Sequence, residues 1–162
     1  MAATATPAVH ALRKHGLDFT EHEYRYEERG GTAVSARELG VPEHQVVKTL
    51  VMEDERKRPL VILMHGDREV STKQLARQIG VKTVRPCAPE VAERHTGYQV
   101  GGTSPFGMRK PLPVYMETSV TTLDRIYVNG GRRGFLVRVD PREVATVLDA
   151  GLVNVAVASA DR

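Results

Sequence analysis

The sequence predicts an α+β fold, with a mixed, partly barrel-like sheet of about six or seven strands and helices packed around it. Short runs of β-branched and other apolar residues recur along the chain, as in buried strands. Helical segments with clear capping residues lie between some of these runs, without the regular alternation of a parallel α/β sheet. The 41% hydrophobic and 27% charged residues are normal for a folded chain. A length of 162 residues suffices for one core, so we expect one domain over residues 1–162.

The N-terminal part is predicted to hold two short helices and one peripheral strand. Thr6 and Pro7 are typical of an N-cap and a first helical residue, and they predict a helix over residues 7–15. A weak strand is expected over residues 18–24, where apolar residues are few. A second helix is predicted over residues 32–39, because a glycine follows it directly.

The central part holds the two most apolar runs of the chain. Residues 46–52 and 60–64 are predicted as buried strands, joined by a charged turn. A capping box beginning at Ser71 predicts a helix through Ile79. Two further elements are expected next, a strand over residues 81–84 and a helix over residues 89–96.

Most of the C-terminal part is predicted as strands. The Asn129-Gly130-Gly131 segment is a strong hairpin signal and indicates a turn between neighbouring strands. Asp140 and Pro141 predict the start of a helix that continues to about residue 149. The strands expected in this part span residues 114–116, 125–129, 135–139 and the alternating valines of 153–157.

Composition argues against several classes of protein. The 23 Lys+Arg and 20 Asp+Glu residues give a net charge of only +3, which is no strong nucleic-acid signature. No apolar run is long enough to span a membrane, and no secretory signal opens the chain. The single cysteine, Cys87, fits a reducing compartment, so a cytoplasmic location is expected.

Common catalytic and metal-binding motifs are missing. The six histidines show no usual zinc spacing, and neither a Walker loop nor a Gly-x-Ser-x-Gly elbow is present. Cys87 lacks a local signature of a nucleophile and is better explained as a small buried hydrophobe. We therefore expect no metal and no cofactor.

Two features remain as candidates for a site. Lys48 is the only charge in its strand, so it must point either to solvent or into a polar cavity. In a cavity it would hold a phosphate or a developing oxyanion. Gly101 and Gly102 lie in a loop and would let the backbone approach a ligand and direct N–H groups at it, although an ordinary tight turn is the alternative.

Three segments together resemble the YbaK family: Val47-Lys48-Thr49-Leu50, Thr96 through Gly107, and Ile126 through Gly134. This family contains the free-standing Cys-tRNA(Pro) deacylase and is related to the editing domain inserted in bacterial prolyl-tRNA synthetases. The similarity runs over nearly the whole chain. It implies the YbaK/ProRS-associated domain fold and an enzyme of translation, a hydrolase or lyase that cleaves the ester of mischarged tRNA.

The resemblance also implies roles for single residues. Lys48 matches the family's essential lysine and is the implied catalytic residue, which we expect to face the glycine loop. The implied substrate-binding residues are Tyr24, Thr49, Gly101, Gly102, Thr103, Ser104, Pro105, Gly130, Gly131 and Arg132. The chain departs from the family pattern at Asn129, Leu136 and Glu117, so we assign no role to a carboxylate.

The leading hypothesis from the sequence is trans-editing of Cys-tRNA(Pro), with attack by the thiol of the substrate itself. The expected partners are aminoacyl-tRNA and prolyl-tRNA synthetase, and no membrane. The alternatives are a deacylase for another amino acid such as alanine, a non-catalytic module that binds the tRNA end or a synthetase, and a hydrolase of small esters.

Overall fold

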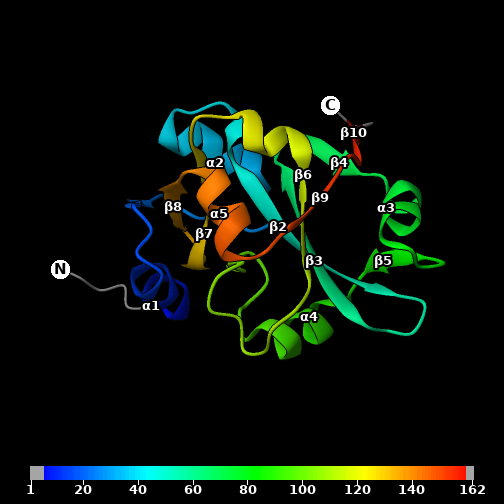
Figure 1. Cartoon of the computed structure of the whole chain (residues 1–162). Coiled ribbons are helices and arrows are strands. Elements are labelled where there is room, and N and C mark those ends of the chain that lie inside the picture. The colour runs from blue at the N-terminus through cyan, green and yellow to red at the C-terminus, as the bar shows by residue number, and fades with distance from the viewer. Residues whose placement is uncertain (1–5, 160–162) are drawn as a thin grey trace.

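The computed structural model describes residues 6–159 and contains the mixed α+β fold that the sequence predicts (Figure 1). Its helices are α1 (Pro7–Lys14), α2 (Gly31–Leu39), α3 (Thr72–Ile79), α4 (Pro89–Thr96) and α5 (Pro141–Val147), with short 3-10 helices η1 (Glu43–Gln45) and η2 (Thr118–Thr122). Its strands are β1 (Thr20–Glu23), β2 (Val47–Asp54), β3 (Pro59–His65), β4 (Arg68–Val70), β5 (Val84–Pro86), β6 (Val114–Glu117), β7 (Ile126–Arg132), β8 (Phe135–Val139), β9 (Gly151–Val153) and β10 (Ala156–Ala158).

The predicted helix starts are confirmed by their hydrogen bonds. The Oγ1 of Thr6 accepts a hydrogen bond from Val9 N at 3.1 Å and begins α1. The Oγ of Ser71 accepts one from Gln74 N at 3.2 Å and begins α3, which ends at Gly80 with a φ of +81°. These signals act within one helical turn, so the sequence alone predicts them.

The strands form three sheets. The largest has the order β5-β2-β3-β6-β9, in which β2 is antiparallel to β3 and β5, while β6 is parallel to β3 and β9. A second sheet has the order β1-β8-β7, and β10 pairs with β4. The first two sheets meet at a bridge between Val46 and Tyr127, which places β7 beside the start of β2.

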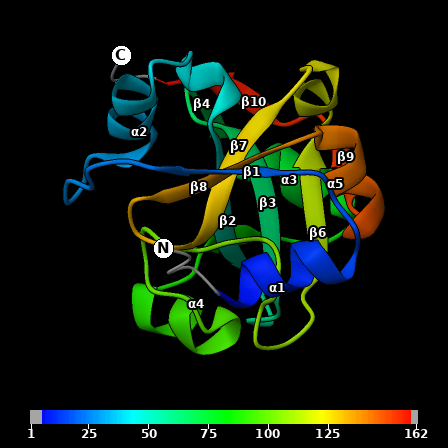
Figure 2. The ribbon, with the colours of Figure 1, turned by 90° about the vertical axis from the view of Figure 1, so that its left-hand side faces the viewer.

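Two hydrophobic cores pack on the two faces of the central strands. Alternate residues of β3, such as Val61 and Leu63, pack in the core that includes α1, β7 and β8. Their neighbours Ile62 and Met64 pack in a second core with α3. Figures 1 and 2 accordingly show α1 and α3 on opposite sides of the large sheet. Burial on both faces explains why β3 is apolar almost throughout.

The prediction of about six or seven strands was too low, because residues 6–159 contain ten. The unpredicted strand β4 is only three residues long, and the single predicted C-terminal strand consists of two, β9 and β10. The strand expected over 81–84 begins only at Val84. The Glu55 carboxylate accepts hydrogen bonds from the N–H groups of Lys82 and Thr83, which are therefore not available to a strand. The last helix ends at Val147 rather than near residue 149.

The hairpin is confirmed, but its turn was placed wrongly. The two residues between β7 and β8 are Arg133 and Gly134, and the φ of Gly134 is +77°. Gly130 and Gly131 lie instead in a bulge of β7 between Asn129 and Arg132. Gly131 leaves room for the side chain of Thr6, because a Cβ at Gly131 would lie only 3.0 Å from the Cβ of Thr6.

The sheets do not close into a barrel. Beyond the bridge at Val46, β7 no longer pairs with β2, and β5 begins to pair only at Met52. One edge of β2 is therefore open in between, and this opening positions the cavity described below. No helix within residues 6–159 has the length and hydrophobicity needed to cross a membrane.

Candidate active site

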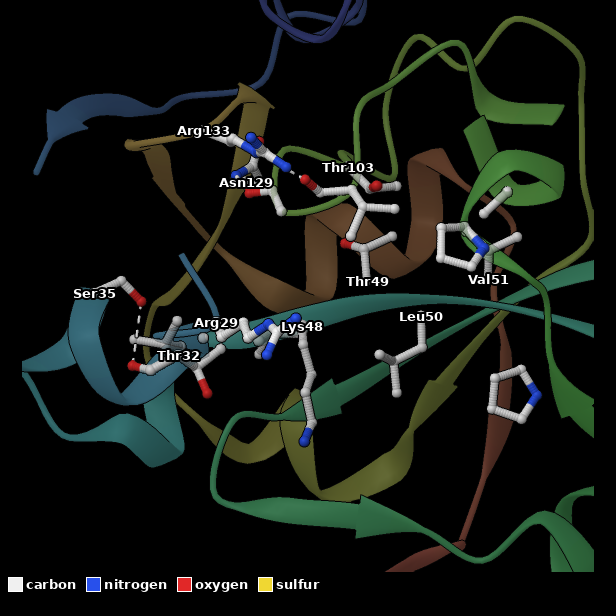
Figure 3. Close-up of a pocket in the computed structure, with 18 of the residues that line it drawn as sticks. Arg29, Thr32, Ser35, Lys48, Thr49, Leu50, Val51, Thr103, Asn129 and Arg133 are labelled. Carbon is white, nitrogen blue, oxygen red and sulfur yellow. Dashed lines mark hydrogen bonds between the residues drawn. The ribbon is translucent and has the colours of Figure 1, made fainter. Parts of the chain in front are cut away.

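A cavity of about 840 Å³ lies along the open edge of β2. It is bounded by α2, by the first half of α4, by the loop around Gly101 and by the β7–β8 hairpin (Figure 3). Polar residues lining it include Thr32, Ser35, Lys48, Thr49, Thr103 and Asn129. Such a volume accommodates a ligand of several chemical groups, which is typical of a small-molecule site.

The main chain of β2 directs polar groups toward this edge. Val46 O accepts a hydrogen bond from Gly66 N, and Asp54 N donates to Arg58 O, so the even-numbered residues face β3. Val51 O accepts from Cys87 N on the other side. Because backbone groups alternate along a strand, the N–H and C=O of Thr49 point toward the open edge.

The side chains of Lys48 and Thr49 leave β2 in opposite directions. Figure 3 shows Thr49 pointing toward Thr103, whereas Lys48 points away from it. The Lys48 side chain is 22% exposed, and its Nζ lies 3.9 Å from Oε2 of Glu69 on β4. The expectation that Lys48 lies at a cavity agrees with this geometry, but the expectation that it faces the glycine loop was wrong. Strand alternation gives that side to Thr49.

The Thr49 hydroxyl is buried without a partner. Its Oγ1 is shielded from solvent and makes no hydrogen bond within the described residues. A buried hydroxyl in this state is unfavourable by about 1–3 kcal/mol. Because Thr49 lies on the cavity wall, rotation of its side chain would make Oγ1 a candidate contact for a ligand.

The loop at Gly101 is built so that only glycine fits. The φ of Gly101 is +88°, and a Cβ there would lie 2.7 Å from Oη of Tyr26. A Cβ at Gly102 would lie 2.8 Å from the main chain of Arg132 and Arg133. The glycines therefore allow the loop to approach the hairpin, which is a structural reason for glycine at both positions.

Two side chains of the hairpin hold this loop in place. Arg133 Nε donates a hydrogen bond to Val100 O at 2.9 Å, and Asn129 Nδ2 donates to Gly101 O at 3.2 Å. The Arg133 guanidinium also lies 5.1 Å from the centre of the Tyr26 ring. Both loop carbonyls are thereby fixed toward the hairpin.

The predicted site residues divide into two groups. Five of them line the cavity: Tyr24, Lys48, Thr49, Gly101 and Thr103. The other six lie outside the lining: Gly102, Ser104, Pro105, Gly130, Gly131 and Arg132.

Each residue of the second group has a structural environment of its own. Ser104 is fully buried, and its Oγ accepts a hydrogen bond from Phe106 N at 3.1 Å. Arg132 pairs with Glu23 at 3.2 Å and covers the ring of Phe135. Gly102, Pro105 and Gly130 are buried, and Gly131 is partly buried.

Sequence reasoning missed several lining residues, above all Asn129, Arg133 and Tyr26. Arg133 was visible only as half of a basic pair, and the hairpin signal at Asn129 suggested a turn. The register of the hairpin would have revealed both residues. With the turn at Arg133 and Gly134, the side chains of Asn129 and Arg133 lie beside the loop that contains Gly101.

The ionisable groups of the cavity do not form an obvious acid–base pair. Burial and the neighbouring Glu53 carboxylate raise the pKa of the Cys87 thiol to about 11, so it stays neutral at neutral pH. Burial also raises the pKa of Tyr24. The described residues that line the cavity include no histidine. The protein therefore offers binding groups here rather than a ready nucleophile.

Comparison with known proteins decides the family. A family model described as "Aminoacyl-tRNA editing domain" matches residues 27–147, which contain nearly the whole cavity lining. The chain belongs to this family. The finding confirms the YbaK-type resemblance and the expected class of enzyme, an aminoacyl-tRNA deacylase.

Individual relatives of this editing domain agree with the assignment. The Enterococcus faecalis protein named "Putative Cys-tRNA(Pro)/Cys-tRNA(Cys) deacylase EbsC" is 29% identical over 93% of this chain and 92% of its own length. A proline--tRNA ligase of Nitratidesulfovibrio vulgaris is 29% identical over 70% of this chain, but over only 19% of the ligase.

Solved structures share the fold. The structure titled "Crystal structure of a putative trans-editing enzyme for prolyl tRNA synthetase" has a TM-score of 0.82 and is 24% identical, with 96% of this chain and 99% of that chain covered. The crystal structure of hypothetical protein APE2540 has a TM-score of 0.86 at 23% identity, with 93% and 99% covered. Both show that this editing domain has the fold expected from the sequence.

Proposed function

We propose that this protein is a trans-editing deacylase that removes cysteine from mischarged Cys-tRNA(Pro). A synthetase cannot reject every amino acid of similar size by binding alone, so such products need a separate enzyme. The observation that carries the proposal is a cavity with polar contacts from Lys48, Thr49 and the Gly101 loop, but without a histidine among its described lining residues. The name of the Enterococcus relative supports the choice of cysteine.

A cysteinyl ester suits such a cavity because it carries its own nucleophile. The substrate sulfur attacks the ester carbonyl, and a tetrahedral oxyanion forms. The bond from the carbonyl carbon to the ribose oxygen then breaks, and the thiol proton ends on that ribose hydroxyl. The products are a cysteine thiolactone and deacylated tRNA. The protein has to orient the ester and stabilise the oxyanion, but needs no nucleophile of its own.

The N–H of Gly101 is the proposed donor to that oxyanion. Because the peptide is planar and trans, Gly101 N–H points opposite to Val100 O, which is held by Arg133. No described group accepts a hydrogen bond from Gly101 N–H. A charge-assisted bond on the carbonyl also makes the N–H of the same peptide a stronger donor.

Lys48 has a different proposed role, binding the phosphate of the terminal nucleotide. Its ammonium group lies on the other side of β2 from the glycine loop, and its contact with Glu69 at 3.9 Å is long. An incoming phosphate would offer a stronger partner than this half-exposed carboxylate. Thr49 lies between the two subsites and would contact the aminoacyl group.

The experiment measures deacylation of tRNA(Pro) charged with cysteine, alanine or serine, using the wild type and Lys48→Ala. We expect cysteine to be released fastest, because serine has a hydroxyl in place of the thiol. Lys48→Ala should raise KM about tenfold, as expected for a lost charge-assisted contact. The control is Lys73→Ala, which changes an exposed lysine on α3.

Each outcome has a distinct meaning. Equal rates for cysteine and serine would contradict attack by the substrate thiol, and faster release of alanine would point to water as the nucleophile. Saturable tRNA binding without release of any amino acid would instead support a non-catalytic binding module.

A further inference from the structure

Four basic residues gather at the C-terminal end of α4. Arg94 and His95 belong to the last turn of the helix. Arg109 returns to the same place, since its N–H donates a hydrogen bond to Thr96 O at 2.8 Å. Its side chain lies against Gly97, where a Cβ would be 3.5 Å from Arg109 Nε. Lys110 follows directly. We call Arg94, His95, Arg109 and Lys110 the α4 basic cluster.

The members of this cluster affect one another electrostatically. Burial lowers the pKa of His95, and the positive charges of Lys110 and Arg94 lower it further, against a smaller opposite effect of Glu53. The Nδ1 atom of His95 is buried and makes no hydrogen bond within residues 6–159. The cluster thus contains an unsatisfied ring nitrogen in a positive field.

The cations of the cluster also lack carboxylate partners. In the described part of the chain, Arg94, Arg109 and Lys110 form no ion pair within 4.0 Å, and their side chains are exposed. By contrast, Arg85 pairs with Glu53 and Arg132 pairs with Glu23. An exposed group of unpaired cations is favourable for a polyanionic partner.

The cluster lies next to the wall of the cavity. Pro89 and Ala92 of α4 line the cavity, and Glu93 accepts a hydrogen bond from Val100 N at 3.1 Å. His95 follows Ala92 by three residues, which corresponds to about 4.5 Å along the helix axis. Figures 1 and 2 show α4 and the segment that connects it to β6 side by side at one end of the molecule.

We propose that the α4 basic cluster binds the phosphodiester backbone of the single-stranded acceptor end of the tRNA whose aminoacyl terminus occupies the cavity. This inference rests on the proposed function, and it adds where the nucleic acid leaves the site. Arginine and lysine bind phosphate oxygens strongly, and the position beside the cavity fits the nucleotides that precede the terminal adenosine. The contacts are to the backbone, so they carry no sequence preference.

The test uses a charge-reversed variant and two substrates. Arg109→Glu with Lys110→Glu is compared with Lys73→Glu and Arg77→Glu, which make the same charge change on the exposed face of α3. The substrates are Cys-tRNA(Pro) and 3′-cysteinyl-adenosine, which has no phosphate. For Cys-tRNA(Pro) we expect the α4 variant to raise KM by about tenfold or more and to reduce the salt-dependence slope by roughly 1.4.

Cleavage of 3′-cysteinyl-adenosine should stay at the wild-type rate in both double variants. An unchanged KM and salt slope for Cys-tRNA(Pro) in the α4 variant would overturn the proposal. Equal losses on the two substrates would also overturn it, because damage to the cavity would then explain them. So would an equal effect of the α3 variant, which would indicate a response to net charge alone.

A separate binding measurement distinguishes this inference from the proposed function. Fluorescence anisotropy with labelled, uncharged tRNA(Pro) reports docking without chemistry. If the wild type releases no amino acid but binds tRNA, and the α4 variant binds at least about tenfold more weakly, the function fails and the docking surface stands. If the wild type does not bind tRNA at all, the docking surface fails.

Discussion

Arg133 Nε donates a hydrogen bond to Val100 O at 2.9 Å, and this contact joins the β7–β8 hairpin to the glycine loop of the cavity. The bond fixes the plane of the Val100–Gly101 peptide, so it also fixes the direction of the Gly101 N–H. The chain thus controls a main-chain donor through a side chain that is distant in sequence. This coupling makes Arg133 a positioning residue for the proposed reaction.

Replacing Arg133 by Met should lower kcat for Cys-tRNA(Pro) about 10- to 100-fold and change KM little, because a charge-assisted hydrogen bond of about 1.5–3 kcal/mol is lost. Steady-state deacylation measures both constants. The NMR signal of the Gly101 amide should shift in the same variant, which a loss of general stability would not cause. Arg77→Met, on an exposed part of α3, is the matched control. A rise in KM with unchanged kcat would show that Arg133 binds substrate instead.

Replacing Gly101 by Ala should impair both the loop and the activity. A Cβ at this position would lie 2.7 Å from Oη of Tyr26, and a φ of +88° is itself strained for alanine by about 1–3 kcal/mol. Urea denaturation and deacylation rates measure the two effects. Adding Tyr26→Phe removes the contacting oxygen, so the double variant should regain part of the lost stability. No recovery in the double variant would mean that the backbone conformation, rather than the contact, is responsible.

Local signals predicted much of the fold, because they act over few residues. Thr6, Ser71 and Gly80 mark helix ends through bonds to the adjacent turn, so their meaning does not depend on the rest of the chain. The position of the hairpin turn failed, because Gly130 is required by the ring of Phe135, which packs against it. A contact of this kind across two strands is not visible in a local pattern.

The sequence pointed to residues 48 and 49 as part of the site, but not to the face of β2 on which each side chain lies. The lone charge in an apolar strand left solvent and a cavity as alternatives for Lys48, and Lys48 lies on the cavity lining. The sequence could not show which face of β2 turns toward the loop, since that depends on which core each face packs against. Thr49, which the family resemblance implied only as a substrate-binding neighbour, therefore occupies the position expected for Lys48.

A second prediction on stability concerns pH. His65 is buried, its Nδ1 lies 2.9 Å from His44 O, and its Nε2 lies 2.7 Å from Ser119 Oγ. Burial lowers its pKa below 6.5, more than the bond to His44 O and the charges of Asp67 and Glu117 raise it. The unfolded chain therefore takes up a proton at this histidine more readily than the folded protein does, so stability falls as the pH drops below 6.5.

Urea denaturation between pH 7.5 and 5 measures this effect. His65→Gln should be less stable at pH 7.5, since it loses a packed ring, but its stability should fall less between pH 7 and pH 5 than that of the wild type. Parallel curves for the two proteins would show that other groups cause the acid sensitivity, for instance His22 and His95, whose pKa values are also lowered.

Replacing Thr49 by Val should separate stability from function. Valine has nearly the shape of threonine but lacks the hydroxyl, and Thr49 Oγ1 is buried without a described partner. Removing an unsatisfied polar group should leave the free energy of unfolding unchanged or raise it by about 1 kcal/mol. If the substrate supplies the missing partner, kcat/KM for Cys-tRNA(Pro) should fall about tenfold in the same variant. Thr49→Ser keeps the hydroxyl and should retain most activity, although it loses a methyl group and hence some stability.

A less stable Thr49→Val protein would reveal a partner for the hydroxyl in the free enzyme, whereas full activity would mean that the substrate never contacts it. Only a hydroxyl kept for the ligand gives the combination of higher stability and lower activity.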